Sequence, residues 1–344
     1  MSAPAVLSLG PSVVVRWRGR PVVVCVAALV VMLVAMLVTL SAGRLGISLA
    51  ELPGVVAGSG SRAQEWVLWT SRLPRLLVGA AAGAAFAVSG AVFQSVTRNP
   101  LGSPDVIGLG AGAAAGAAAA GLVWPGVVPV PVGALIGAGI AIGAVYLGSG
   151  AGFRAPLRMV VVGIAVGAMS LAFVQLALAR ATREDAQVLA AYLNGSLAAR
   201  AWSDVLLVVA ALVVLLPVAL VLTRPMQLVE MGDEVAVAVG VRADRVRTWA
   251  VVVGVLLTAA AVTVSGPIAF VALTAPQIAR RLTRSTGPGM VAAACCGAAV
   301  LVVADLVAQY AVPGVVYPVG VVTAALGGVY LAFLLVREWR RSPA

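Results

Sequence analysis

Long apolar runs follow one another through this chain and decide what it can fold into. A helix rises about 1.5 Å per residue, so about 20 apolar residues cross the 30 Å hydrocarbon core of a bilayer. Apolar residues make up 62% of the chain, well above the roughly 45–50% of a soluble domain. We therefore predict an all-α polytopic membrane protein. Its ten transmembrane helices are expected over residues 22–40, 76–96, 106–123, 130–147, 159–179, 205–222, 249–264, 268–278, 290–312 and 319–336.

The run at 268–278 is short for a transmembrane helix. Its eleven residues rise only about 17 Å. One continuous helix over 249–279 is the alternative, and it would be about 46 Å long. Gly266-Pro267 is expected to break the chain into two helices, and the arginine distribution described below also favours the ten-helix interpretation.

The charged residues are few, and their kinds exclude much chemistry. All 23 basic residues are arginine, against 12 acidic residues, and the chain has no lysine and no histidine. Histidine-dependent catalytic pairs, a Schiff-base lysine and a GxxxxGK[ST] phosphate loop are therefore excluded. We expect no catalytic residue, no metal site and no cofactor bound by this chain.

The arginines predict the orientation of the helices, because cytoplasmic loops carry an excess of basic residues. Alternate loops hold sixteen and seven arginines. The side with sixteen is assigned to the cytoplasm, which places both terminal segments there, residues 1–21 and 337–344. Between them we expect one ten-helix bundle, 22–336, with a long cytoplasmic loop at 224–247, so that 1–344 forms a single domain.

Asp305 is the one acidic residue well inside a predicted transmembrane helix. A carboxylate in the membrane is costly and is therefore a candidate for function. Proton-coupled carriers usually show several such groups in a relay, and this chain has one. Two interpretations remain open, a direct role in transport and a hydrogen bond between helices.

Small residues recur at four-residue spacing within the apolar runs, as at Gly79 and Gly83 and at Gly139 and Gly143. Small side chains let helices approach closely in lipid. Close helix packing and the lining of a wide pathway are both consistent with this spacing.

Two segments and two shorter motifs carry a long ordered pattern. The first, at 72–116, reads RLPRLLVGAAAGAAFAVSGAVFQSVTRNPLGSPDVIGLGAGAAAG, and the second, at 265–282, reads SGPIAFVALTAPQIARRL. VADLVAQ follows from Val303 and YPVGVVTAALGG from Tyr317. In this order and spacing the chain resembles the FecCD family, the permease subunits of ATP-driven bacterial importers for iron-siderophores, haem and vitamin B12.

The resemblance implies an ABC importer type II permease fold in the inner, or cytoplasmic, membrane. It implies a dimer of permease subunits, identical or paralogous, with two ATP-binding subunits below and an extracytoplasmic solute-binding protein above. ATP and Mg would be used by the partner ATPase. Iron-siderophores are the expected cargo, and haem or vitamin B12 import by the same mechanism is the alternative.

By the same resemblance, Arg72 and Arg75 are expected to dock acidic residues of the binding protein. An arginine fork suits a carboxylate; the alternative is a pair of arginines snorkelling to the interface. Asn99, Pro100 and Leu101 are candidate cytoplasmic gate residues where two permease copies would meet. A loop that merely ends the helix is the alternative, since a residue before proline disfavours helix.

The loop 224–247 resembles the family's coupling element, which docks in a cleft of the ATPase. Acidic residues crowd the start of a helical stretch, where negative charge suits the helix N-terminus. Apolar residues in the same stretch are hard to leave in water without a partner, although a solvated loop is the alternative. The residues expected to couple to the ATPase are Glu230, Asp233, Glu234, Ala236, Val239, Gly240 and Val241.

Two glutamines stand where many members of the resembled family carry other residues. Gln277 takes the place of a histidine or asparagine after a proline, and Gln309 takes the place of a frequent arginine. Individual contacts at these positions are expected to differ from those of other members.

A secondary transporter driven by protons or sodium is the competing class. Such carriers use inverted repeats and broken helices at the bilayer midplane. The only hint of a repeat is Ser89-Gly90 against Ser265-Gly266. Uptake that depends on ATP and an added ATPase would separate the importer from this class.

Overall fold

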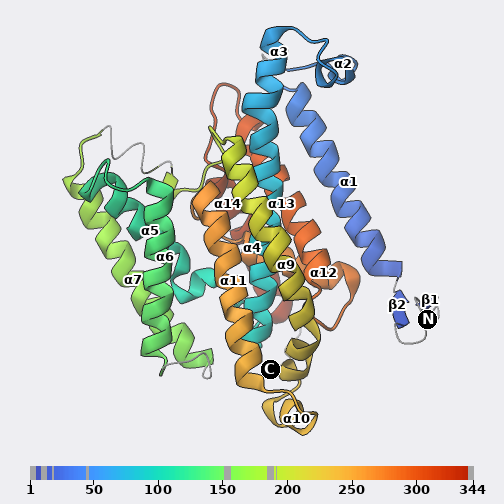
Figure 1. The fold of residues 1–344 in the computed structure, drawn as a ribbon, viewed down its shortest axis with the longest axis vertical. Helices are drawn as coiled ribbons and strands as arrows, with labels where there is room; N and C mark the ends of the chain where they lie inside the picture. The colour runs from blue at the N-terminus through green and yellow to red at the C-terminus, as the bar shows by residue number, and fades with distance from the viewer. Residues whose placement is uncertain are drawn as a thin grey trace.

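The computed structural model describes residues 5–8, 14–17, 19–43, 46–150, 156–183, 190 and 192–339. Its helices form one elongated bundle, with α2 and α3 at one end and α10 at the other (Figure 1). The helices of the first half are Gly19–Ser41 (α1), Leu52–Val56 (α2), Arg62–Trp66 (α3), the π-helix Val67–Arg72 (η1), Leu73–Val96 (α4), the 3₁₀ turn Pro104–Ile107 (η2), Leu109–Ala118 (α5), the π-helix Ala119–Val123 (η3), Val130–Gly148 (α6) and Pro156–Arg180 (α7). Those of the second half are Trp202–Glu230 (α9), Asp233–Ala238 (α10), Ala243–Ser265 (α11), Val271–Thr283 (α12), Met290–Tyr310 (α13) and Val319–Trp339 (α14).

Each of the ten predicted apolar runs coincides with a helix, which confirms a helical, multi-pass membrane protein. Among the described residues, seven helices are long and apolar enough to cross a bilayer, and two shorter apolar helices cover 109–123 and 319–333. The run at 268–278 forms α12, which has 13 residues. The number of ten spans stays a prediction. Two short antiparallel strands that were not expected, Ala5–Ser8 (β1) and Val14–Trp17 (β2), precede α1.

The predicted break between α11 and α12 is confirmed. Gly266 ends α11 with a φ of +71°, a conformation that favours glycine. A Cβ at this position would lie 2.2 Å from the carbonyl oxygen of Tyr192, so a side chain has no room there. Pro267 follows, and α12 begins only at Val271. The alternative of one continuous helix over 249–279 is therefore wrong.

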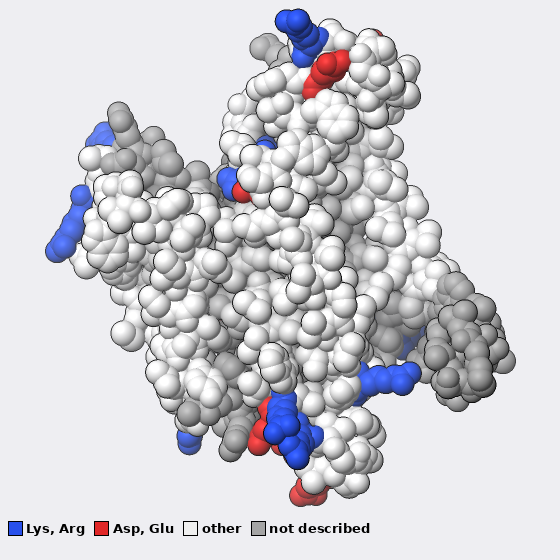
Figure 2. Space-filling model, viewed as in Figure 1, with Lys and Arg blue, Asp and Glu red and all other residues white. Residues whose placement is uncertain are grey.

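Helix α4 is the centre of the bundle and is packed against α9, α11, α12 and α13. Most of its residues are buried, whereas α1, α7 and α9 leave most of theirs exposed. Those exposed residues are largely valine and leucine, which suits helices that face lipid. In Figure 2 the visible face has a broad uncharged band between two charged ends. This pattern is the one expected of a chain that crosses a bilayer.

Glycines set the closest helix contacts, as the spacing suggested. At the crossing of α4 and α13, a Cβ on Gly83 would lie 2.4 Å from the carbonyl oxygen of Gly297. Gly90 brings α4 even closer to the carbonyl oxygen of Ala272, near the start of α12. Gly139 and Gly143 on α6 have open space instead. Close packing thus explains some of these glycines and not others.

Candidate functional site

An ion pair joins α4 to α13 near the end of the bundle that carries α2 and α3. Arg75 Nε donates to Asp305 Oδ2 at 2.9 Å, and Nη2 donates to Oδ1 at 2.8 Å. The Asp305 side chain is only 2% exposed, and Gln309 Nε2 also donates to Oδ2, at 2.8 Å. The acidic residue inside the bundle is therefore paired and fully hydrogen-bonded, in the way that makes a buried carboxylate tolerable.

Arg72 has a different partner, the end of α1. Its Nη1 donates to the carbonyl oxygens of Thr39 and Leu40, and Nη2 donates to that of Ala42 at 2.8 Å. The last carbonyls of a helix have no partner within the helix and carry its negative dipole end. A guanidinium placed there satisfies several of them at once. Arg72 thus fastens the start of α4 to the end of α1.

Both arginines line one pocket of about 190 Å³, together with Ser71 and Tyr310 among other residues. They therefore face the same way. Each of them also has partners within the chain, which the sequence did not predict. Their role in docking a binding protein stays a prediction.

The predicted gate residues form a tight turn after α4. Asn99 Oδ1 accepts from the backbone N–H of Leu101 at 2.9 Å, the Asx-turn geometry that ends a chain segment locally. Gln277 of α12 donates to the Pro100 carbonyl oxygen, and Gln94 Nε2 donates to that of Leu273, also on α12, at 2.9 Å. The turn is thereby fixed to α12. Whether it gates a pathway is not tested by these contacts.

The predicted coupling residues lie on and around α10, at the opposite end of the bundle from α2 and α3 (Figure 1). Arg247 of α11 donates to Asp233 through both terminal nitrogens, with Nη1 to Oδ2 at 2.9 Å. Arg98, directly after α4, donates to Asp233 Oδ1 and to the carbonyl oxygen of Val229. The Asp233 carboxylate therefore connects α10 to the end of α4 and the start of α11, and Arg98 also connects both to the end of α9.

The environment of Asp233 keeps it ionised. The hydrogen bond from Arg247 lowers the pKa of the Asp233 carboxyl, and the hydrogen bond from Arg98 and the charge of both arginines act in the same direction. Arg247 is 4% exposed and Asp233 is 49% exposed. The pair thus has one buried partner and one partner open to solvent.

Apolar side chains on α10 and its flanks are exposed. Ala236 is buried and packs with Val229 and Ala243. Met231, Val237 and Val239 are more than half exposed. Among the other predicted coupling residues, Glu234 is exposed, whereas Val241 and Glu230 are half-buried. Gly240 follows the helix with a φ of +81°, and a side chain there would meet open space. The segment therefore offers a small apolar surface beyond the bundle.

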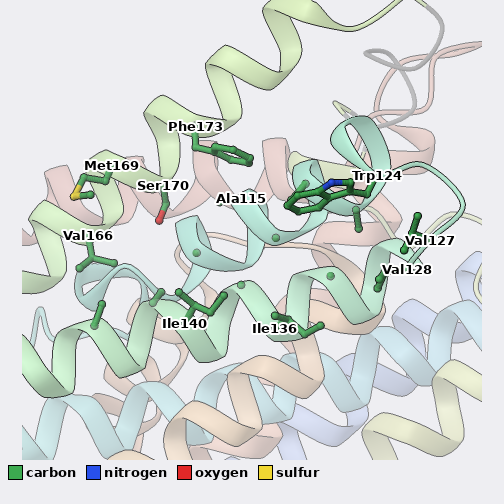
Figure 3. Close-up of a pocket in the computed structure, with 18 residues that line it drawn as sticks. Ala115, Trp124, Val127, Val128, Ile136, Ile140, Val166, Met169, Ser170 and Phe173 are labelled. Atoms are coloured by element: carbon green, nitrogen blue, oxygen red, sulfur yellow. The ribbon is translucent and has the colours of Figure 1, made fainter.

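A cavity of about 550 Å³ lies between α5, α6 and α7 (Figure 3). Ile136, Ile140, Phe173 and Trp124 surround it, and the other lining residues are small or apolar except for Ser170. No charged residue lines it. A hydrophilic chelate would find no partners there, so we do not count it as a substrate site.

Sequence reasoning missed the contacts that join these residues. Arg75 and Asp305 are 230 positions apart, so nothing local signals that they pair. Arg98 and Arg247 were counted as markers of orientation, although they hold Asp233. Gln277, noted only as a departure from the family pattern, is the residue that binds the Pro100 carbonyl oxygen.

Comparison with known proteins gives consistent matches over nearly the full length. A sequence profile described as the FecCD transport family matches residues 30–337. The ferric enterobactin transport system permease protein FepG of Escherichia coli is 37% identical over 94% of this chain and 98% of its own. The Fe(3+)-citrate import system permease protein YfmE of Bacillus subtilis is 33% identical over 95% of this chain and 98% of its own.

A solved structure matches the fold. It is described as an inward-facing conformation of a metal-chelate type ABC transporter, with a TM-score of 0.81 over 91% of this chain and 99% of that chain. At 24% identity this likeness concerns the fold alone.

Proposed function

The chain belongs to the FecCD transport family, and from this premise we propose that it moves a ferric siderophore or a related iron chelate into the cytoplasm. It is the membrane-spanning permease subunit of an ABC importer. It is a transport subunit and not an enzyme. Iron chelates are the cargo named for its relatives, including ferric enterobactin and ferric citrate.

One observation in the structure carries the mechanism. Helix α10 and its flanks expose Met231, Val237 and Val239 beyond the bundle, while Asp233, the first residue of α10, binds Arg98 and Arg247. An exposed apolar patch of this kind marks a protein interface. A helix that binds a partner on one side and is bonded to the bundle on the other can pass a movement of the partner to the bundle.

The partners proposed are two ATP-binding subunits on the side of α10, which would use ATP and Mg. A second permease subunit and an extracytoplasmic binding protein complete the importer. The side of α10 is then the cytoplasm, the membrane is the inner or cytoplasmic membrane, and both termini lie inside. The excess of arginines in the loops on that side supports this orientation.

The path of the movement follows the contacts of Asp233. When the ATP-binding subunits close, α10 moves with them and displaces Arg98 and Arg247. Arg98 lies directly before the turn Asn99–Leu101, so the turn shifts with it. Gln277 and Gln94 pass the shift to α12. Transport requires two discrete packings of the helices, and this chain of contacts would select between them.

Arg72 and Arg75 are proposed to receive acidic residues of the binding protein. A guanidinium has five N–H donors, and Arg75 uses two of them for Asp305. The remaining N–H groups of both arginines can take a carboxylate at the mouth of the pocket that they share. Their partners within the chain would hold the two guanidinium groups in place before the binding protein docks.

The other functions considered are not favoured. The similar permeases FepG, YfmE and FecD are named for ferric enterobactin and ferric citrate transport, which favours an iron chelate over haem or vitamin B12. Asp305 is paired with Arg75 and has no second carboxylate as a hydrogen-bond partner, so a proton relay of the kind used by ion-coupled carriers has no support among the described residues.

The cargo is tested by competition. The permease is reconstituted in liposomes with its ATP-binding subunit and its binding protein, and the uptake of radioactive iron is measured for ferric enterobactin and ferric citrate. Excess haem or cobalamin serves as the competitor. We expect uptake of at least one iron chelate that neither competitor reduces. Uptake of haem or cobalamin in place of every iron chelate tested would overturn the proposal.

A further inference from the structure

A groove opens on the membrane-facing surface between α1 and α9, at the end of the bundle that carries α10. Both helices contact α13, and the start of α13 forms the floor between them. The groove has a volume of about 460 Å³ and is lined by residues of α1, α9, α13 and the loop between α12 and α13. Figure 1 shows the lower end of α1 next to α12 at this corner.

The lining of the groove is apolar. Val22, Cys25 and Val26 line one wall, Leu220 the other, and Met290 and Val291 the floor. The threonine hydroxyls in it bond to their own helices, Thr223 to the Ala219 carbonyl oxygen and Thr283 to that of Ala279. These two hydroxyl groups are therefore already hydrogen-bonded within the chain, and the groove suits hydrocarbon rather than water or a hydrophilic solute.

Arginines surround the end of the groove nearest α10. Arg20, Arg224 and Arg284 are each adjacent in sequence to a lining residue, and all three are exposed. Arg20 Nε donates to the Leu282 carbonyl oxygen at 2.7 Å, which holds its guanidinium between α1 and the end of α12. No acidic residue lines the groove, and none of the ion pairs among the described residues involves these arginines.

We propose that this groove binds an anionic phospholipid, with its acyl chains between α1 and α9 and its phosphate on Arg20, Arg224 and Arg284. The position in the membrane selects a lipid, because the walls are helices that cross the bilayer. The positive rim, on a groove whose lining holds no acidic residue, selects a negative headgroup, and basic pockets between transmembrane helices bind such headgroups. Guanidinium groups also bind phosphate oxygens through paired N–H donors.

The site is independent of the transport cycle described above. It shares no residue with Asp233, the turn at 99–101 or the pair Arg75–Asp305. A bound lipid would fix α1 to α9 and α13 on the side where α10 lies. Its removal is therefore expected to lower the thermal stability of the permease without changing its cargo.

Native mass spectrometry of the full-length permease in detergent tests the proposal. Phosphatidylglycerol and phosphatidylcholine with the same acyl chains are added in turn, and glycerol phosphate is the probe for the headgroup alone. We expect phosphatidylglycerol to bind more tightly than phosphatidylcholine, and glycerol phosphate to show no binding. The single variants Arg20→Gln and Arg284→Gln should each weaken phosphatidylglycerol binding about fivefold. Both should leave phosphatidylcholine binding unchanged.

Two further variants keep the test decisive. Arg62→Gln removes an exposed arginine from the opposite end and should change nothing. Val291→Trp fills the floor of the groove, leaves the arginines in place, and should abolish the preference for phosphatidylglycerol. Equal binding of phosphatidylglycerol and phosphatidylcholine by the unmodified permease would overturn the proposal. It would also be overturned if the preference for phosphatidylglycerol persisted in the double variant Arg20→Gln, Arg284→Gln and in Val291→Trp. The second result would indicate that the groove accepts a protein segment or another ligand instead.

Discussion

Single side chains fix the relation between distant helices in this permease. Arg75 and Asp305 join α4 to α13, Arg72 closes the end of α1, and Asp233 connects α10 to Arg98 and Arg247. Each contact neutralises a charge or satisfies carbonyls inside a mostly apolar bundle. These charged residues therefore lie where two helices meet and must keep a defined position.

Removing one partner of the pair Arg75–Asp305 should destabilise the permease more than replacing both partners. Asp305→Asn leaves a half-buried guanidinium without its counter-charge and should lower the free energy of unfolding by about 3 kcal/mol. Replacing both partners by apolar residues, as in Arg75→Met with Asp305→Leu, should recover much of that loss. Thermal unfolding of the purified permease in detergent measures both variants.

The stability of the same double variant tests the structural role considered for Asp305. A structural role requires that the double variant be more stable than Asp305→Asn. If the double variant is as unstable as the single one, the pair is not what holds α4 to α13. Arg75 is also a candidate docking residue, so the double variant could lose transport for either reason. Stability is therefore the quantity to measure.

Asp233 predicts a defect in coupling rather than in folding. Asp233→Asn keeps the shape of the side chain but loses the charge that binds Arg98 and Arg247. We expect ATP-driven uptake to fall at least tenfold while the ATP-binding subunit still copurifies and hydrolyses ATP. Asp233→Glu, which keeps the charge, is the matched control and should retain more uptake than Asp233→Asn. Equal uptake by Asp233→Asn and the unmodified permease would contradict the proposed path.

At the scale of elements, helix contacts depend on a few glycines. Gly83→Ala places a Cβ 2.4 Å from the Gly297 carbonyl oxygen, so α4 and α13 must separate. We expect a lower melting temperature for this variant. Gly139→Ala enters open space within α6 and should be neutral or slightly stabilising, since alanine is the better helix former. A Gly83→Ala permease that melts at the same temperature as Gly139→Ala would show that this crossing is not close-packed.

Most elements could be predicted from apolar runs and helix breakers. The run boundaries match α1, α6 and α13 to within a few residues, because apolar length is a local property. The run at 205–222 ends eight residues before α9 does, at Glu230. Gly266-Pro267 marked the end of α11 for the same reason. The strands β1 and β2 and the π-helices within the long helices carried no such signal.

The site was predictable by residue but not by contact. The coupling residues were found from a local acidic and apolar pattern around Asp233 and Val239. Their partners Arg98 and Arg247 come from other helices, and pairing across the bundle depends on how the helices pack. Sequence periodicity does not contain that information. The same limit hid the partner of Asp305.

At the scale of the whole molecule, the orientation can be measured directly. In a background with Cys25, Cys295 and Cys296 replaced by alanine, Ala57→Cys lies near α2, and Arg242→Cys lies between α10 and α11. A membrane-impermeant thiol reagent added to intact spheroplasts should label Ala57→Cys alone. Permeabilised spheroplasts should label both. Labelling of Arg242→Cys in intact spheroplasts would reverse the orientation and remove α10 from the ATP-binding subunits.

The central claim is that an ATP-binding partner drives this permease through α10. The most direct measurement is uptake of a ferric siderophore into liposomes that contain the permease and its ATP-binding subunit, with the binding protein added outside. The account predicts uptake that requires ATP inside the liposomes, that persists when proton and sodium gradients are abolished, and that is lost without the ATP-binding subunit. Uptake driven by an ion gradient in liposomes holding the permease alone would contradict it.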